Sequence, residues 1–215
     1  MSAYKVTFNC GALTLEGSLA RPQKPAPWAA VLLCHPHPLY GGNMDNNVIQ
    51  AVSEKLVSQG LAALRFNFRG VGGSEGSFDD GKGEEMDAHA ALTFLRNYEG
   101  IEANKIGILG YSFGGLVALT AGVKNDLVQA VGGISPIMRP GILQNCLKPV
   151  LLAYGTKDDV IDPKKIISES EGSPGQALVE TIAGADHFFW GYEKEVAEKM
   201  AAFFVRQLCP GQVAG

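Results

Sequence analysis

A serine between two glycines, at the junction of a predicted strand and a predicted helix, constrains this chain more than any other feature. The pentapeptide Gly110–Gly114 reads Gly-Tyr-Ser-Phe-Gly. Residues 105–109 before it are mostly apolar and predict a buried strand, and the small apolar residues 115–121 after it predict a buried helix. A strand that turns directly into a helix strains the serine backbone and leaves no room for a Cβ two residues away on either side. The two glycines meet that steric demand, so we expect Ser112 at a sharp strand-to-helix turn.

The same glycine–serine–glycine pattern occurs a second time, at Gly72–Gly76. The residues that follow it, 77–83, are rich in Asp and Gly, which favours a loop rather than a helix. We therefore interpret Ser74 as a residue of a surface turn and Ser112 as the functional serine.

Predicted strands and helices alternate along most of the chain. Two short alternating segments indicate an antiparallel hairpin, and later strands are apolar runs typical of strands buried on both faces. Repeated strand–helix units require a mostly parallel, twisted sheet with helices on both faces. The sequence thus predicts a single α/β domain over residues 1–215 with a sheet of seven to eight strands. The predicted strands are 4–9, 13–20, 29–34, 64–68, 105–109, 128–134, 150–154 and 177–182, and the predicted helices are 47–59, 84–97, 115–121, 192–208 and one that begins at Pro163.

Composition narrows the classes of partner. The 215 residues are 46% hydrophobic, which suits one globular domain with a full core. A net charge of −4 argues against nucleic acid or an anionic membrane as a partner. The N-terminus lacks the apolar segment of a signal peptide, and four cysteines without a Cys-x-x-Cys pair indicate reduced thiols. We expect a cytoplasmic protein, a monomer or small homo-oligomer, that acts on a small molecule.

A serine hydroxyl is a weak nucleophile until a base accepts its proton and an acid orients that base. Along a chain of this architecture the order is serine, acid, histidine. Of the four histidines, only His187 follows Ser112. It lies in the loop between the last predicted strand and the last predicted helix, and we expect it to be the base.

The acid is expected directly after the predicted strand 150–154, where Asp158, Asp159 and Asp162 all occur. Asp162 precedes a proline and is interpreted as the N-cap of the next helix. Asp186, next to the histidine, is expected to hold its loop in place.

Two backbone N–H groups must face the negative charge that develops on the substrate oxygen. Phe113, directly after the serine, is expected to supply the first. The second is expected from the loop 35–42, which reads His-Pro-His-Pro-Leu-Tyr-Gly-Gly and whose prolines have no N–H. His37, Leu39 and Tyr40 are the candidates there.

The residues around these segments suggest a substrate pocket. We expect Tyr40, Leu39 and Met138 to contact the substrate. Arg69 could bind a substrate carboxylate, but a structural ion pair is the favoured interpretation. No metal or cofactor is implied, because the His-x-His pair in the loop 35–42 has no second cluster of ligands to complete it. Further candidates for the pocket wall are Asn43, Ile137 and residues 188–190.

Three segments together resemble the small bacterial α/β-hydrolases akin to the dienelactone hydrolases: 35–42, 65–72 and 184–189. The resemblance covers nearly the whole chain. It implies an α/β-hydrolase fold, and it matches Asp158 to the acid of a Ser112–Asp158–His187 triad, with Asp159 as the alternative. The resemblance also favours His37 as the second oxyanion donor, with Leu39 and Tyr40 as alternatives. Dienelactone hydrolases proper use a cysteine nucleophile, so the serine here weakens any transfer of their lactone substrate.

Caps in this fold usually enter between the sixth and seventh strands. Residues 135–148 are too few for a helical cap, so we expect an open site without a lid. These features favour a hydrolase of small carboxylic esters that works through an acyl-enzyme. The alternatives are an acyl-thioester hydrolase with the same triad, and a catalytically inactive scaffold or binding protein. A complete set of serine, acid, base and oxyanion loop favours catalysis.

Overall fold

The protein structure, a computed structural model, describes residues 2–175 and 177–211. The strands are β1 (Ser2–Cys10), β2 (Leu13–Arg21), β3 (Trp28–Cys34), β4 (Ala62–Phe66), β5 (Ile101–Tyr111), β6 (Val128–Ile134), β7 (Val150–Gly155) and β8 (Leu178–Ile182). The helices are the 3₁₀ helix η1 (Pro38–Tyr40) and the α-helices α1 (Asn47–Ser58), α2 (Lys82–Asn97), α3 (Phe113–Val123), α4 (Pro163–Glu171) and α5 (Glu193–Leu208).

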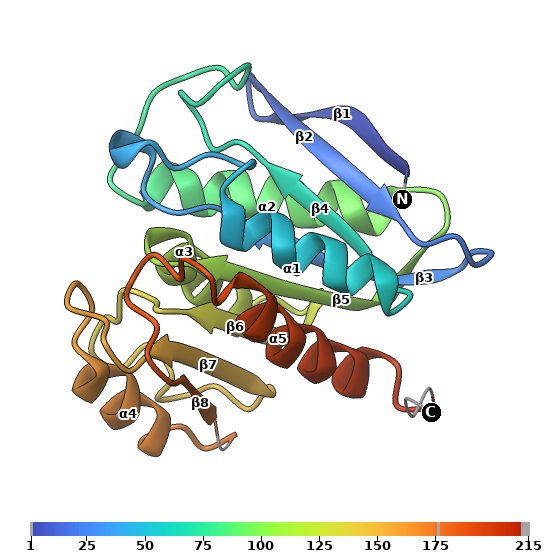
Figure 1. Cartoon of the computed structure of the whole chain (residues 1–215). Coiled ribbons are helices and arrows are strands. Elements are labelled where there is room, and N and C mark those ends of the chain that lie inside the picture. Colours follow the sequence, from blue (N-terminus) through green and yellow to red (C-terminus); the bar gives the residue numbers. More distant parts are fainter. Residues whose placement is uncertain (1, 176, 212–215) are drawn as a thin grey trace.

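All eight strands belong to one sheet, in the order β1-β2-β4-β3-β5-β6-β7-β8 (Figure 1). β2 is antiparallel to both of its neighbours. The strands that follow it in this order, β4, β3, β5, β6, β7 and β8, are all parallel to one another. This is the mostly parallel α/β-hydrolase sheet that the strand–helix alternation predicted.

Apart from the start of β5, the predicted boundaries agree with the structure within two residues, although β4 is shifted by two residues as a whole. β4 spans Ala62–Phe66 rather than 64–68, because the backbone N–H of Phe68 donates to a histidine side chain instead of a neighbouring strand. β5 begins at Ile101, four residues before the predicted start. Its first residue pairs with Trp28 of β3 across an irregularity in the register, which a search for apolar runs does not detect.

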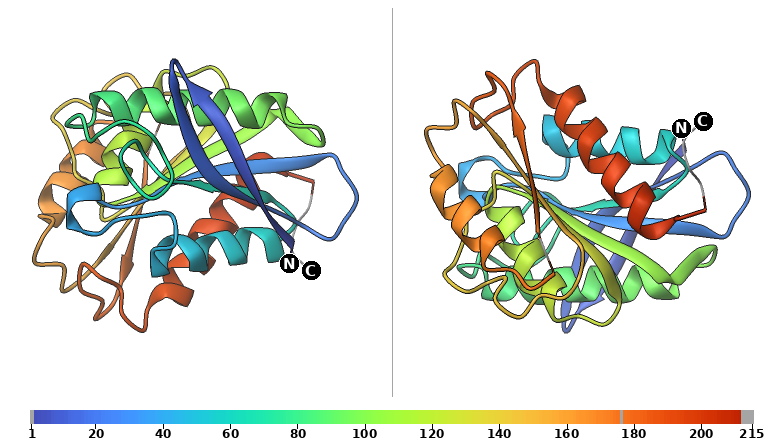
Figure 2. Two further views of the ribbon diagram at one scale, coloured as in Figure 1. Left: turned by 90° about the horizontal axis from the view of Figure 1, so that it is seen from above. Right: turned by 90° about the horizontal axis from the view of Figure 1, so that it is seen from below.

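Helices cover both faces of the sheet, so the sheet is the middle of three layers (Figure 2). α1 and α5 pack on one face around a core that includes Val52 and Phe204. α2, α3 and α4 pack on the other face with Leu92, Val117 and Ile166. Because the sheet lies between these layers, every residue of β3 is buried, which explains why that strand is a continuous apolar run.

The carboxyl ends of the parallel strands meet at one edge of the sheet, on the left in Figure 1. Ligands bind at this edge in open α/β sheets. The segment that follows β6, residues 135–149, forms turns and no helix, so the edge has no cap. The site there is open to solvent, as expected from the length of this segment.

Ser74 differs from its predicted role. It lies in a turn, but it is buried rather than exposed. Its hydroxyl donates to the backbone carbonyl of Asn67 at 2.7 Å and accepts the backbone N–H of Glu16 at 3.0 Å. The turn folds back on β2, so the second glycine–serine–glycine motif has a structural role: its serine hydrogen-bonds the turn to β2.

The four cysteines are free, and Cys10, Cys34 and Cys146 are buried while Cys209 is partly exposed. Burial raises the pKa of the Cys34 thiol, and the negative charge of Asp87 raises it further. A buried protonated thiol of this kind is chemically inert. Within residues 2–175 and 177–211, no helix combines the length and apolar character needed to cross a bilayer.

Candidate active site

Ser112 lies where β5 turns into α3, in the strained conformation that the sequence predicts. Its φ is 55° and its ψ is −116°, a region that residues other than glycine seldom occupy. A Cβ on Gly110 would overlap the carbonyl oxygen of Gly114, and a Cβ on Gly114 would overlap the carbonyl oxygens of Cys34 and His35. The two glycines are therefore required by close backbone packing, and this packing holds the serine at a fixed position.

The structure brings together the serine, histidine and aspartate that the sequence predicts. His187 Nε2 lies 3.1 Å from Ser112 Oγ. His187 Nδ1 lies 3.0 Å and 3.2 Å from the two carboxylate oxygens of Asp158. The three residues follow β5, β8 and β7, so their side chains meet only because these strand ends share one edge of the sheet. Asp159, the alternative acid, is exposed and makes no hydrogen bond to this histidine.

The Asp158 carboxylate is held in its charged form. Burial raises its pKa, but hydrogen bonds from His187 and from the backbone N–H of Ile161 outweigh burial and lower the pKa overall. The hydroxyl of Ser135 makes no hydrogen bond of normal geometry in the described structure, but it also stabilises this charge. An ionised carboxylate only accepts hydrogen bonds, so His187 carries its proton on Nδ1. Nε2 is then free to accept the hydroxyl proton of Ser112.

The loop that carries His187 is held from two sides. Asp186 Oδ1 accepts the backbone N–H groups of Phe188 at 2.9 Å and Phe189 at 3.1 Å, which confirms its expected role in the loop. The hydroxyl of Tyr111 donates to the backbone carbonyl of His187 at 2.5 Å. Sequence analysis missed this tyrosine. Its position next to the serine was a signal, but its acceptor lies 76 residues away in the chain.

The loop after β3 contains the expected oxyanion donors. Leu39 N–H donates to His37 Nδ1 at 3.2 Å, and Tyr40 N–H donates to the His37 carbonyl at 3.1 Å. Both alternative donors are therefore occupied within η1. The N–H groups of His37 and Phe113 donate to no group among residues 2–175 and 177–211. This arrangement favours His37 and Phe113 as the pair that faces a substrate oxygen.

His35 is buried and uses both ring nitrogens. Its Nδ1 lies 2.7 Å from the carbonyl oxygen of Pro36, which can only accept, and its Nε2 accepts the backbone N–H of Phe68 at 3.1 Å. The ring is therefore neutral, with the proton on Nδ1, and it connects the loop 35–42 to the segment after β4. Neither nitrogen is left for a metal, and no group of three potential ligands gathers in the described part of the chain.

Burial lowers the pKa of His35 to about 4 from its ordinary value of 6.5. Between these values the unfolded chain binds the proton and the folded protein does not, so stability falls as the pH falls. We expect His35 to account for a loss of about 2 kcal/mol between pH 7 and pH 5. Urea unfolding of wild type and His35→Gln at both pH values measures this, and the stability gap between them should narrow on acidification. A constant gap would contradict the prediction.

A cavity of about 460 Å³ opens beside Ser112 and His187. Tyr40 lines it as predicted, but Leu39 and Met138 do not. Leu39 is 68% exposed on the outer side of η1, and Met138 packs against the apolar core. The further candidates Ile137 and Phe188 line the cavity together with Val160 and Ile161, which sequence analysis missed. Asn43 instead braces its own loop, and Phe189 is buried in the core.

Larger hollows of about 690 Å³ and 820 Å³ also open on the described surface, but neither is lined by Ser112 or His187. We take the cavity beside the serine as the substrate site because it contains the reactive groups. Arg69 is bound by Asp87, with 2.7 Å between Nη2 and Oδ1, and the Asp87 side chain is fully buried. This is the structural ion pair that was the favoured interpretation of Arg69.

Comparisons with known proteins agree with this architecture. A protein-family model described as the dienelactone hydrolase family matches residues 15–206. The chain is 37% identical over 198 residues to the uncharacterized protein RP471 of Rickettsia prowazekii (strain Madrid E), covering 86% of this chain and 82% of that protein.

Two solved structures are similar over nearly their whole length. An alpha-beta serine hydrolase homologue from Coxiella burnetii has a TM-score of 0.85 at 28% identity and covers 94% of this chain and 97% of its own. XC6422 from Xanthomonas campestris, described as an α/β serine hydrolase without lid, has a TM-score of 0.86 at 26% identity and covers 99% of this chain and 98% of its own. Family and fold together support hydrolase activity. The chain belongs to the dienelactone hydrolase family.

Proposed function

We propose that this protein is a serine hydrolase that cleaves small carboxylic esters through an acyl-enzyme intermediate. One observation carries the proposal: a continuous chain of hydrogen bonds runs from Asp158 through His187 to Ser112 Oγ. The serine at its end opens onto a cavity of about 460 Å³. This volume suits a small-molecule substrate.

In the first step, Ser112 Oγ attacks the carbonyl carbon of the ester while its proton passes to His187 Nε2. The charge of Asp158 stabilises the imidazolium that forms. The negative charge on the substrate oxygen is held by the backbone N–H groups of His37 and Phe113. When the bond from carbon to the leaving oxygen breaks, His187 returns the proton to that oxygen and the alcohol departs.

In the second step, His187 removes a proton from water, whose oxygen attacks the acyl-enzyme. The bond between Ser112 Oγ and the acyl carbon breaks, the serine regains its proton from His187, and the carboxylic acid leaves. Apart from the substrate and water, each step uses only side chains and backbone N–H groups of this chain. A thioester would follow the same two steps with a thiol as the leaving group.

Labelling with a fluorophosphonate probe tests the proposal, because the probe forms a stable bond only with an activated serine. We expect an adduct on the peptide that contains Ser112, located by mass mapping. The Ser112→Ala variant and the heat-unfolded wild type are controls and should give no adduct. Folded wild type that remains unlabelled at Ser112 would contradict the proposal and favour a scaffold without catalysis. Turnover of matched esters and thioesters then separates the two substrate classes.

A further inference from the structure

No charged side chain of the Lys, Arg, Asp or Glu type lines the cavity beside Ser112 in the described structure. Its wall outside the catalytic groups is largely apolar, with Ile137, Val160, Ile161 and Phe188. Burial lowers the pKa of His37, which also lines the cavity, so this ring is neutral at neutral pH. An acyl chain bound here contacts groups that cannot neutralise a charge.

The charges that shift the pKa values of His37 and Tyr111, two residues of the cavity wall, are negative. Burial is the main influence on the pKa of His37, and the carboxylates of Glu84 and Asp80 act on it as well. Burial raises the pKa of Tyr111, and the charges of Asp158 and Asp186 raise it further. A carboxylate on the substrate would lose water on entering the cavity and would also meet this negative field.

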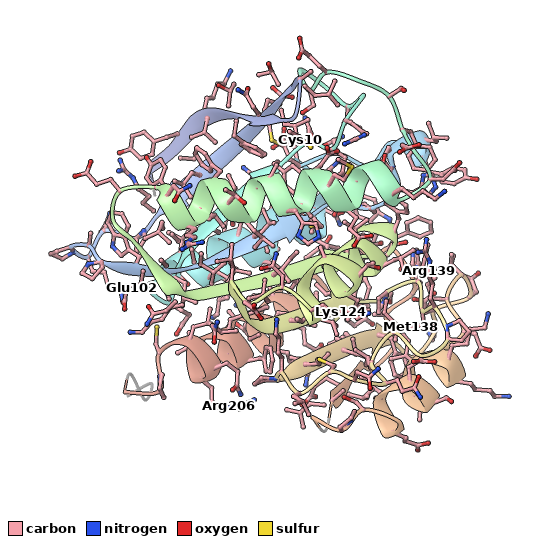
Figure 3. All side chains as sticks on the ribbon, turned by 180° about the vertical axis from the view of Figure 1, so that it is seen from behind. Cys10, Glu102, Lys124, Met138, Arg139 and Arg206 are labelled. Carbon is pink, nitrogen blue, oxygen red and sulfur yellow. The ribbon has the colours of Figure 1, made fainter. Side chains whose placement is uncertain are left out.

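The arginines near this end of the molecule do not reach the cavity. Arg69 is neutralised by Asp87 at 2.7 Å. Arg139 is exposed and lies against Gly81, just before α2, next to Met138 (Figure 3). Neither arginine lines the cavity, and among the described residues no lysine does, so no Lys or Arg in this part of the chain is placed to bind an anionic substrate there.

Large apolar side chains stand exposed at the cavity. Tyr40 is 88% exposed, Val160 57% and Phe188 54%, and all three line the cavity. They come from three separate loops, after β3, β7 and β8. An acyl chain that extends from the cavity toward solvent gains apolar contacts with them, because these side chains have little other cover.

We infer that the site selects neutral esters with an apolar acyl chain and rejects esters whose acyl chain carries a carboxylate. This specificity rests on the proposed ester-hydrolase function and names its substrate class.

The test compares two p-nitrophenyl esters of equal chain length. One is the hexanoate, and the other is the monoester of hexanedioic acid, which ends in a carboxylate instead of a methyl group. We expect kcat/KM to be higher for the hexanoate by on the order of 10²-fold at low salt. Added salt should lower the ratio of the two kcat/KM values, because it screens the repulsion between the carboxylate and the acidic groups.

A positive charge placed in the cavity wall tests whether electrostatics causes this selectivity. Val160→Lys adds a cation at an exposed position of the cavity wall and removes an apolar contact, so we expect kcat/KM for the anionic ester to rise by about tenfold and that for the hexanoate to fall. Leu147→Lys is the matched control. Leu147 is 80% exposed and precedes β7, at the amino ends of the parallel strands, so this variant should keep the wild-type ratio.

The outcomes distinguish the two proposals. Folded protein that hydrolyses neither ester would overturn the ester-hydrolase function and this inference with it. Equal turnover of both esters would overturn the inference alone. A preference for the anionic ester would also overturn it and would indicate that Arg139 reaches the substrate. A ratio unchanged in Val160→Lys would show that charge at the cavity does not determine the selectivity.

Discussion

Replacing Ser112 with alanine is expected to lower kcat for a neutral p-nitrophenyl ester by on the order of 10⁴-fold or more. The variant has no nucleophile, so only the oxyanion donors and substrate binding remain. His187→Ala is expected to cause a similar loss, since no other described side chain is hydrogen-bonded to Ser112 Oγ. Steady-state kinetics on the purified variants measure both effects, with circular dichroism to establish that each is folded.

The double variant Ser112→Ala/His187→Ala tests whether the serine and the histidine act together in one step or contribute independently to kcat. Residues that act in one step show strongly non-additive losses, so the double variant should be about as slow as either single variant. Additive losses would mean that serine and histidine do not act as a unit. Such a result would contradict the proposed mechanism even if each single variant were slow.

Asp158→Asn is expected to lower kcat by on the order of 10³- to 10⁴-fold. Asparagine has nearly the same shape as aspartate but no charge to stabilise the imidazolium. Its amide can also donate to His187 Nδ1, which would place the histidine proton on Nε2 and block its action as a base. Asp159→Asn is the matched control, because the same change at the exposed neighbouring residue should alter kcat by less than about threefold.

The reverse order of effects would assign the acid to Asp159. Stability provides a second readout for Asp158. Its lowered pKa means that its ionised form stabilises the folded state at neutral pH, and this contribution is lost as the pH falls through the folded pKa. The difference in melting temperature between wild type and Asp158→Asn should therefore shrink on acidification, whereas that for Asp159→Asn should stay small throughout.

The fold was largely predictable because its signals are local. Apolar runs buried on both faces of a parallel sheet, such as β3, differ clearly from the amphipathic pattern of α1. The errors arose where partners distant in the chain decide the local structure. β4 ends early because His35 takes the N–H of Phe68, and Ser74 is buried because its turn packs on β2.

The sequence predicted the reactive residues of the candidate site better than it predicted the wall of the cavity. Ser112, His187 and the segment around Asp158 follow from motif and chain order. The substrate wall was predicted poorly: Tyr40 lines the cavity, whereas Leu39 and Met138 do not. A loop side chain can point to solvent, to the core or to a cavity, and its sequence neighbours do not distinguish these directions.

The sequence by itself determined the strand–helix alternation and the strained turn at Ser112, because periodicity and backbone sterics act between residues close in the chain. Only the tertiary structure decided which aspartate reaches His187, that Tyr111 donates to the His187 carbonyl, and that no Lys, Arg, Asp or Glu of the described residues lines the cavity. These features depend on how loops from separate strands pack at one edge of the sheet. That packing is a property of the whole fold, and no single segment encodes it.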